Sequence, residues 1–230
     1  MCHPSCIEFV TSQLSPQEIR GMDVLEVGSR DVNGSVRPLV EQAHPARYVG
    51  VDIEEGPGVD EICDASDLVA HFGSEQFDVV VSTELLEHVQ DWRQAVRQMK
   101  DVLRPGGTLL ITTRSKGFGV HAYPHDYWRY ELDDMRRIFS DLKIESLERD
   151  PTRPGVFLKA HKPPGFEPAR LDDVALYSII RQRRALDVTE EEAREFKPPF
   201  TVIGFLWGLL PEQIRTNGFR PLLRQLLRKP

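Results

Sequence analysis

The sequence predicts an α/β fold: a doubly wound, mostly parallel seven-stranded sheet with helices on both faces, followed by a mainly helical C-terminal extension. Short β-branched apolar runs alternate with stretches that place apolar residues at helical spacing, which is typical of α/β layering. The runs are almost continuously apolar, as in strands buried on both faces. Such sheets bind ligands beyond the carboxyl ends of their strands. The four runs span residues 22–27, 48–53, 77–82 and 108–113.

Helical spacing fills the intervals between these runs. It is clearest at residues 91–103, where Trp92, Val96 and Met99 share one side and Arg93 and Arg97 the other. The "RPGG" stretch that follows ends this helix and turns the chain into the next strand. Other helices are expected over residues 33–43, 65–72 and 128–142, and over 7–13 as a lid on the ligand cleft.

The end of the chain differs from its beginning. Residues 143–149 and 155–161 alternate like an antiparallel pair that closes one sheet edge, and the Pro- and Gly-rich residues 162–168 are typical of a linker. We therefore expect a core domain over 1–160 and an extension over 161–230 that serves as a cap, a dimer contact or an acceptor-binding segment. Residues 198–230 mix apolar residues with Arg and Lys, which leaves open a contact with a membrane surface or a lipid-linked acceptor.

The charge distribution and the cysteine content narrow the possible partners and cellular location of the protein. Residues 1–160 carry 17 Lys and Arg against 27 Asp and Glu, a net charge of −10, whereas residues 161–230 carry 12 against 9, a net charge of +3. An acidic body repels a phosphate backbone, which disfavours nucleic acid as a partner. The chain has three cysteines and lacks secretory and membrane-spanning apolar runs, which favours a cytoplasmic setting. Cys2, His3 and Cys6 have no second pair of zinc ligands at a useful spacing.

The first strand ends in a glycine turn, "LEVGS", with Glu26 two residues before Gly28. A glycine at this point lets the backbone turn against a ligand, and the helix expected from Asn33 would direct free N–H groups at the turn. Asp52 ends the next strand, where a carboxylate can accept hydrogen bonds from both ribose hydroxyls. Asp64, in "CDASDL", can accept one from an exocyclic amine. The pattern predicts a site for an adenine nucleoside.

The ordered motifs "LEVGS", "VGVDI", "DAS", "FDVVVSTELLEHV" and "LRPGGTLLITT" resemble those of the class I (Rossmann-like) S-adenosylmethionine-dependent methyltransferases over residues 22–113. The resemblance implies a methyltransferase that binds S-adenosylmethionine. Arg30 and Val32 replace the later glycines of the family's turn, so Arg30 either reaches the cofactor carboxylate or, as we favour, lies in solvent. The departure leaves open a non-catalytic cofactor-binding partner. The implied cofactor-binding residues are Glu26, Gly28, Ser29, Asp52, Ile53, Asp64, Ala65 and Ser82.

Two stretches offer groups for the methyl acceptor. In "ELLEH", Glu84, Glu87 and His88 would share one face of a helical turn, and two carboxylates with an imidazole suit Mg²⁺ or another divalent ion. Such an ion lowers the pKa of an acceptor hydroxyl. The pattern is similar to that of the metal-assisted O-methyltransferases of ubiquinone biosynthesis and of small-RNA 3′ ends. The alternative is that His88 packs locally or lines the rim of the site.

The second stretch, "HAYPHDYWRY", follows the strand at 108–113, where this fold places its substrate loop. We expect His125 to be the general base or a fourth metal ligand, with His88 and His121 as the other candidates. Tyr123 and Tyr127 are candidates for stacking on the acceptor. Trp128 and Arg129 are expected to anchor the loop.

The expected reaction is methylation of a hydroxyl on a small molecule such as a sugar, a polyketide or another secondary metabolite, with a histidine base. No Asn/Asp-Pro-Pro-Tyr motif for amide or base nitrogens follows the strand at 77–82. The alternatives are a metal-assisted 2′-O-methyltransferase of RNA ends and a nicotinamide-dependent reductase. The short-chain Tyr-x-x-x-Lys pair of such reductases is absent. The chain is expected to act alone or as a homodimer.

Overall fold

The computed structural model describes residues 3–122 and 125–197. Met1–Arg194 form one compact unit. Residues 162–194, which the sequence suggested as the start of an extension, lie in this same unit, and Val174, Leu176 and Ala185 belong to its larger core cluster. Residues 198–230, which carry the basic amphipathic pattern, lie outside the described residues.

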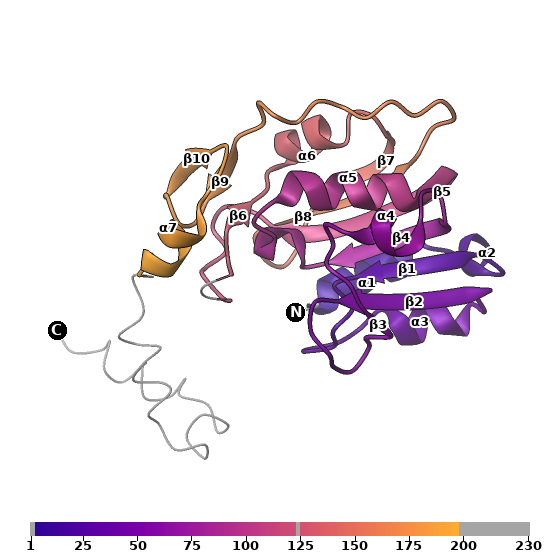
Figure 1. Ribbon diagram of the computed structural model, residues 1–230. Coiled ribbons are helices and arrows are strands. Elements are labelled where there is room, and N and C mark those ends of the chain that lie inside the picture. The colour runs from indigo at the N-terminus through magenta and orange to yellow at the C-terminus, as the bar shows by residue number, and fades with distance from the viewer. Residues whose placement is uncertain (1–2, 123–124, 198–230) are drawn as a thin grey trace, which may run out of the picture. The chain divides into compact units, whose positions relative to one another are not determined.

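A seven-stranded sheet lies at the centre of this unit, with the order β3-β2-β1-β4-β5-β8-β7 (Figure 1). The first five strands of this order are parallel, and β8 and β7 close one edge as an antiparallel pair. The predicted doubly wound sheet and its antiparallel edge are confirmed. The strands are β1 (Asp23–Val27), β2 (Arg47–Asp52), β3 (Glu61–Ile62), β4 (Phe77–Thr83), β5 (Leu103–Arg114), β7 (Lys143–Arg149) and β8 (Gly155–His161).

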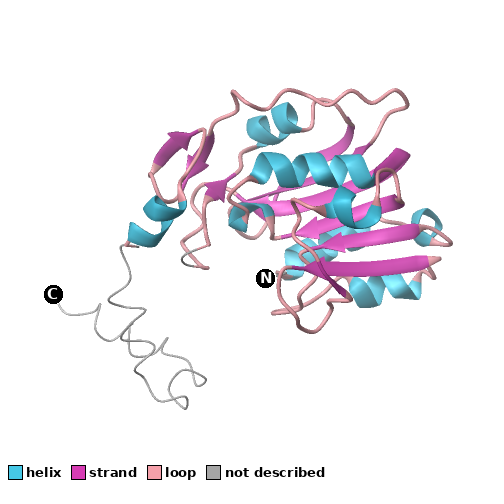
Figure 2. Ribbon diagram, viewed as in Figure 1, coloured by secondary structure: helices cyan, strands magenta, loops and turns pink. Residues whose placement is uncertain are grey.

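Helices cover both faces of the sheet (Figure 2). On one face α4 (Leu68–Phe72), α5 (Trp92–Val102) and α6 (Leu132–Ile138) bury their apolar residues in the larger core cluster. On the other face α1 (Pro4–Gln13), α2 (Pro16–Ile19) and α3 (Arg37–Gln42) form a second cluster. Valine-rich strands contribute to both clusters, as the continuous apolar runs predicted.

One helix starts later than the sequence indicates. The helix expected from Asn33 begins at Arg37. The Asp31 carboxylate accepts a hydrogen bond from the Gly34 N–H at 2.7 Å, and Gly34 has a φ of 123° that keeps this stretch out of the helix. The turn after β1 is correspondingly long, and no helix N-terminus lies directly behind Gly28.

The chain after β8 returns to the loop that follows β5. It runs past α5, where the Arg93 guanidinium donates to the carbonyls of Leu171 and Val174 at 2.9 and 2.7 Å. It then forms a small sheet of order β10-β9-β6, in which β9 (Leu176–Ser178) pairs with β6 (Trp128–Arg129) from the loop after β5 and with β10 (Arg183–Ala185). A short helix, α7 (Glu190–Glu195), follows. Within the described residues, no helix combines the length and the apolar character needed to cross a bilayer.

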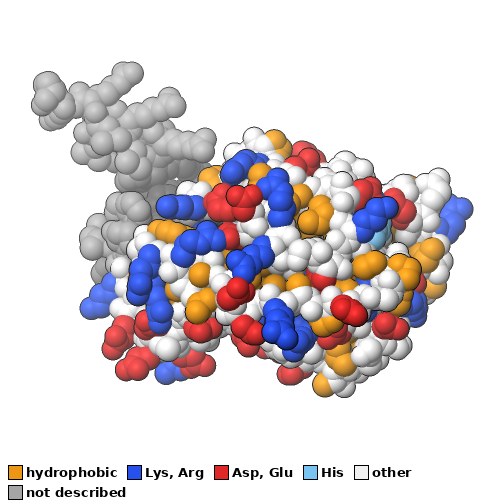
Figure 3. All heavy atoms as spheres, turned by 90° about the horizontal axis from the view of Figure 1, so that it is seen from above, with side chains coloured by type: hydrophobic (Ala, Val, Ile, Leu, Met, Phe, Trp, Pro, Cys, Tyr) orange, Lys and Arg blue, Asp and Glu red, His pale blue; other side chains and the backbone are white. Residues whose placement is uncertain are grey.

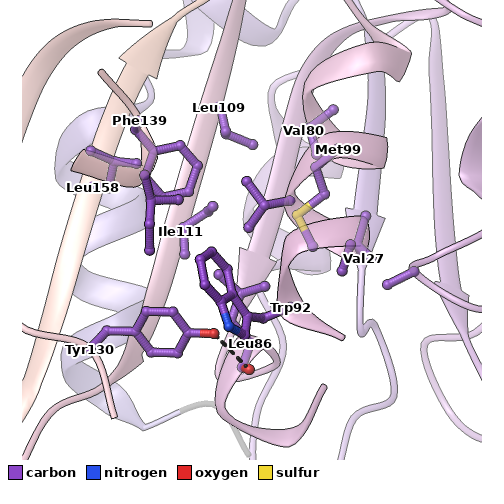
Figure 4. Packing of buried hydrophobic residues seen from close by; sticks show 14 of the residues in the cluster. Val27, Val80, Leu86, Trp92, Met99, Leu109, Ile111, Tyr130, Phe139 and Leu158 are labelled. Carbon is purple, nitrogen blue, oxygen red and sulfur yellow. Dashed lines mark hydrogen bonds between the residues drawn. The ribbon is translucent and has the colours of Figure 1, made fainter. Parts of the chain in front are cut away.

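The larger core cluster supports the segment that follows β4. Figure 4 shows Tyr130 and Trp92 directed toward Leu86, and the Tyr130 hydroxyl donates a hydrogen bond to the Leu86 carbonyl at 3.1 Å. All three side chains are fully buried. Leu86 opens the 3₁₀ turn η1 (Leu86–His88), so the core fixes the residues that carry the polar groups of the site.

Candidate active site

Gly28 forms the turn at the end of β1. Its φ of +80° is costly for any residue with a Cβ. The N–H groups of Gly28 and Ser29 both donate to the Val51 carbonyl, at 2.9 and 3.0 Å. A Cβ on Gly28 would lie 3.1 Å from the Leu85 side chain. The glycine turn therefore touches the segment that follows β4.

A second glycine contact was not predicted. A Cβ on Gly50 of β2 would lie 2.4 Å from the Gly58 carbonyl oxygen, so the loop after β2 packs directly on the strand. The Asp31 N–H donates to the Pro57 carbonyl at 2.7 Å and joins the same loop to the turn after β1. The sequence features that indicate this contact are the stretches "VGVDI" and "GPGVD", because each places a glycine where two backbones meet.

The predicted ribose and adenine residues lie together at the carboxyl ends of β2 and β3. Asp52 is half-buried, and one of its carboxylate oxygens accepts the Arg30 N–H at 3.3 Å. The side chains of Ile53 and Ile62 are 65% and 49% exposed, although both are large and apolar. With Asp64 they line an open hollow of about 610 Å³. Apolar walls beside a carboxylate suit a flat base that carries an amino group.

Three further predicted cofactor residues, Glu26, Ala65 and Ser82, are buried. Ser82 donates its hydroxyl hydrogen to the Val27 carbonyl at 3.0 Å, and Ala65 is buried in the larger core cluster. Glu26 is buried and accepts a hydrogen bond from the Tyr48 hydroxyl. Burial raises the pKa of Glu26 to about 7, against the opposing effect of Tyr48. Arg30 pairs with Glu54 at the surface, as the solvated alternative predicted.

Three polar side chains converge next to the turn after β4. The Glu87 Oε1 atom lies 3.8 Å from His88 Nε2 and 3.9 Å from His121 Nε2, and the two Nε2 atoms are 3.1 Å apart. Glu87 is fully buried, and its Oε1 accepts no hydrogen bond from any described residue. Its other oxygen accepts one from the Thr113 hydroxyl at 2.8 Å. We call Glu87, His88 and His121 the Glu-His-His cluster.

Glu84 does not join this cluster, so the trio expected from "ELLEH" is not brought together. Residues 86–88 form a 3₁₀ turn rather than an α-helix, and Glu84 has a φ of +56°. Its carboxylate pairs with Arg114 and accepts a hydrogen bond from Thr112 at 3.1 Å. His121 takes the third position instead. Helical spacing could not indicate this, because His121 comes from another loop.

The outer nitrogens of both imidazoles have their own partners. His88 Nδ1 lies 2.6 Å from the His125 carbonyl oxygen, and His121 Nδ1 lies 3.2 Å from the Asp126 carboxylate. Arg129 holds Asp126 with two hydrogen bonds of 2.6 and 2.9 Å. Burial opposes ionisation of Asp126, but the hydrogen bonds from Arg129 and His121 outweigh it and lower its pKa well below the usual range. Burial lowers the pKa of His88.

The other predicted residues of the substrate loop have different surroundings. The His125 side chain is exposed and directed at the Tyr127 hydroxyl, 3.1 Å from its Nδ1, so only its carbonyl reaches the cluster. Tyr127 is buried and is not open to stacking on an acceptor. Trp128 and Arg129 are fully buried anchors, as expected. Tyr123 lies outside the described residues.

The order of the sheet, the glycine turn after β1 and the carboxylate that ends β2 together define a class I S-adenosylmethionine-dependent methyltransferase. Enzymes of this class bind a nucleoside cofactor on a doubly wound α/β fold. A family model described as "Methyltransferase domain" matches residues 5–150, and the chain belongs to this family.

Several relatives are described as ubiquinone biosynthesis O-methyltransferases. The protein from Parvibaculum lavamentivorans is 36% identical over 70 residues, which cover 30% of this chain and 27% of that protein. One from Coxiella burnetii is 23% identical over 136 residues, 54% of this chain and 55% of that protein. The match to a Chromobacterium violaceum protein is longer, with 25% identity over 205 residues, 80% of this chain and 86% of that protein. The chain thus spans about a quarter to a half of the first two relatives.

Solved structures share the fold. The Burkholderia thailandensis 1,6-didemethyltoxoflavin N1-methyltransferase, solved with S-adenosylhomocysteine, has a TM-score of 0.55 at 16% identity, covering 69% of this chain and 78% of that one. An S-adenosylmethionine-dependent methyltransferase from Mesorhizobium loti has a TM-score of 0.52 at 17% identity, covering 67% and 96%. At these identities the likeness shows the fold alone.

Proposed function

We propose that this methyltransferase transfers the methyl group of S-adenosylmethionine to a hydroxyl of a small molecule at the Glu-His-His cluster. The observation that carries the proposal is the contact between Gly28 and Leu85, because it places the cofactor turn beside the segment that bears the cluster. Parallel strands β1 and β4 are neighbours, so their carboxyl ends meet at one edge of the sheet. Cofactor and acceptor groups then lie within reach of one another.

The reaction is a displacement at carbon. A lone pair of the acceptor oxygen forms the new C–O bond as the C–S bond breaks, and the bonding electrons return to sulfur to give S-adenosylhomocysteine. Alignment of the three atoms supplies much of the rate. The hydroxyl proton must leave, and an imidazole of the cluster can take it as a general base. Burial lowers the pKa of His88, which favours the neutral, proton-accepting form at neutral pH.

Oxygen is favoured over nitrogen as the methylated atom for two reasons. A neutral amine needs no strong base, whereas an alcohol does, and the cluster places two imidazoles and a carboxylate at one point. The relatives described as O-methyltransferases support the same assignment. The net charge of −10 over residues 1–160 supports a small acceptor over RNA, and on the face in Figure 3 Lys and Arg side chains are interspersed with Asp and Glu.

The test is transfer of a labelled methyl group from S-adenosylmethionine to a panel of small phenols, alcohols and sugars, with matched amines and thiols and a short RNA. Mass spectrometry of the products identifies the methylated atom. We expect label on oxygen of at least one small acceptor. Label confined to amines or thiols would contradict O-methylation, and label on the RNA end would favour the 2′-O-methyltransferase alternative.

A further inference from the structure

We propose that Tyr48 and Arg37 are positioning residues for the Glu26 carboxylate, and that this carboxylate releases one proton to solvent when the cofactor binds beside it. The ionised carboxylate then faces the positively charged amino-acid end of S-adenosylmethionine. For the identity of the ligand this inference rests on the proposed function, but the proton release can be measured without turnover.

The sheet holds Glu26 in a position that only Tyr48 reaches with a polar group. Glu26 is 2% exposed and lies level with Gly50 of β2 and Val81 of β4, neither of which has a polar side chain. Tyr48 comes two residues before Gly50 on β2 and therefore lies on the same face of the sheet. Its ring extends past Gly50, and its hydroxyl donates a hydrogen bond to the Glu26 carboxylate.

Arg37 of α3 covers Tyr48 and fixes the loop that follows β2. The guanidinium carbon of Arg37 lies 4.4 Å from the centre of the Tyr48 ring, within the range of a cation–π contact. The same guanidinium pairs with Asp60 and donates to the Gly58 carbonyl at 3.1 Å. Asp60 in turn accepts the Gly50 N–H at 2.7 Å. One arginine thus connects the residue that orients Glu26 to the loop beside the cofactor turn.

The surroundings of Glu26 favour its protonated form. Burial raises the pKa of Glu26 to about 7, and the Tyr48 hydrogen bond and the positive charge of Arg37 oppose this only in part. The other charged groups that act on Glu26 are Asp31 of the turn after β1 and Asp60 of the loop after β2, and both raise its pKa further. At pH 7 about half of the molecules therefore carry a neutral Glu26.

The order of the sheet brings a positively charged part of the cofactor to Glu26. The hollow that contains Asp64 lies beyond β2 and β3, whereas the Glu-His-His cluster follows β4, on the other side of β1. A cofactor that places its adenine in the hollow and its methyl group at the cluster must cross the end of β1. The part that crosses carries the sulfonium and the ammonium groups. An opposite charge within about 4–6 Å lowers the pKa of a carboxyl by about 1 to 3, so the bound cofactor favours ionised Glu26.

Ser29 independently indicates that a ligand binds at this turn. Its side chain is buried, and its hydroxyl has no hydrogen-bond partner among the described residues. A Cβ on Gly50 would lie 2.7 Å from this hydroxyl, so Ser29 is packed against the strand position level with Glu26. A buried hydroxyl without a partner is costly. The carboxylate at the amino-acid end of the cofactor can accept its hydrogen.

The test is calorimetric titration of the full chain with S-adenosylhomocysteine, which has the same ammonium group, at several pH values. We expect the dissociation constant to be about 5- to 25-fold larger at pH 5.5 than at pH 7.5, because ionised Glu26 attracts the ligand and neutral Glu26 does not. Titrations at pH 6 in two buffers of different ionisation enthalpy should show release of about half to one proton per bound ligand. Glu26→Gln should remove both effects.

Tyr48→Phe separates positioning from a structural role. It removes the hydrogen bond that favours the ionised carboxylate, so the pKa of Glu26 should rise. At pH 7 the variant should bind S-adenosylhomocysteine about 3- to 10-fold more weakly than the wild type, and the two affinities should converge toward pH 9. Arg37→Met should shift the pH profile in the same direction. Tyr177→Phe is the matched control, since its hydroxyl bonds to Gln182, and it should bind like the wild type at every pH.

An affinity independent of pH would overturn the inference. So would a pH dependence that persists in Glu26→Gln, which would assign the proton to another group such as His71 of the adenine hollow. A loss of affinity in Tyr48→Phe that is equal at every pH would make Tyr48 a structural residue. The two proposals fail separately. Proton-linked binding without methyl transfer to any hydroxyl would contradict the proposed function alone, and transfer to a hydroxyl with pH-independent cofactor binding would contradict this inference alone.

Discussion

Glu84 and Arg114 form an ion pair that is almost completely enclosed, with side chains 3% and 2% exposed. Arg114 also pairs with Asp150 at 3.0 Å, so one guanidinium neutralises two buried carboxylates beneath the active site. The α1 helix adds the Ser5 hydroxyl, which donates to Asp150 at 3.0 Å. This network holds Glu84 away from the Glu-His-His cluster and joins the N-terminal helix to the site.

Arg114→Met should lower the free energy of unfolding by about 3–5 kcal/mol, because it leaves Glu84 and Asp150 buried without a counter-charge. Chemical denaturation of the purified variant measures this loss. Arg136→Met is the matched control, since its pair with Asp133 is exposed, and it should change stability by less than about 0.5 kcal/mol. Equal effects of the two substitutions would show that the network has no special role.

Asp52→Ala should weaken binding of S-adenosylhomocysteine about 10- to 100-fold, because the ribose hydroxyls lose a charged acceptor. Asp133→Ala, on the exposed surface of α6, serves as the control. Titration calorimetry gives both affinities. An unchanged affinity for Asp52→Ala would mean that the ribose does not lie at the end of β2.

His121→Ala should reduce turnover about 10²- to 10⁴-fold while S-adenosylhomocysteine affinity is kept, because the side chain lies in the cluster and away from the cofactor residues. His125→Ala should cause a smaller loss, since its imidazole is exposed and directed at Tyr127. Steady-state kinetics and calorimetry separate the two effects. Loss of affinity and turnover together would instead mark His121 as a structural residue.

Glu26 should make stability depend on pH. Its pKa in the folded chain is about 7, above its ordinary value of 4.5, so folding favours the protonated carboxyl. The stabilisation of the folded state by this group is therefore complete below pH 4.5 and is lost as pH rises through 7. Relative to Glu26→Gln, the wild type should lose at most about 3 kcal/mol of unfolding free energy between pH 4.5 and pH 8. Denaturation of both proteins across this range measures the difference. Parallel stability curves would contradict a raised pKa at Glu26.

The strands were predictable because strand and core patterns are local. Residues 143–149 and 155–161 form β7 and β8 at the predicted positions, and the valine runs of β1 and β4 are buried. The small sheet was not predictable, since β6 and β9 have two or three residues each and exist through pairing between distant segments. The start of α3 was misplaced because the Asp31 turn overrides helix propensity.

The cofactor residues were proposed from order and spacing along the chain, and the structure places Asp52, Ile53 and Asp64 around one end of the sheet. The acceptor cluster was only half predictable. Glu87 and His88 are neighbours in sequence, but His121 joins them from a loop that the Asp126–Arg129 pair holds in place. The left-handed backbone at Glu84, which removes the expected ligand, has no local sequence signal.

Binding of S-adenosylmethionine at the carboxyl ends of β1 and β2 is the step on which all of the proposed chemistry depends. Calorimetric titration of the full chain with S-adenosylhomocysteine measures this binding, with NADH as the control ligand. We expect one site per chain of micromolar affinity for S-adenosylhomocysteine and no binding of NADH. If S-adenosylhomocysteine does not bind, with or without Mg²⁺, these strand ends are not a cofactor site.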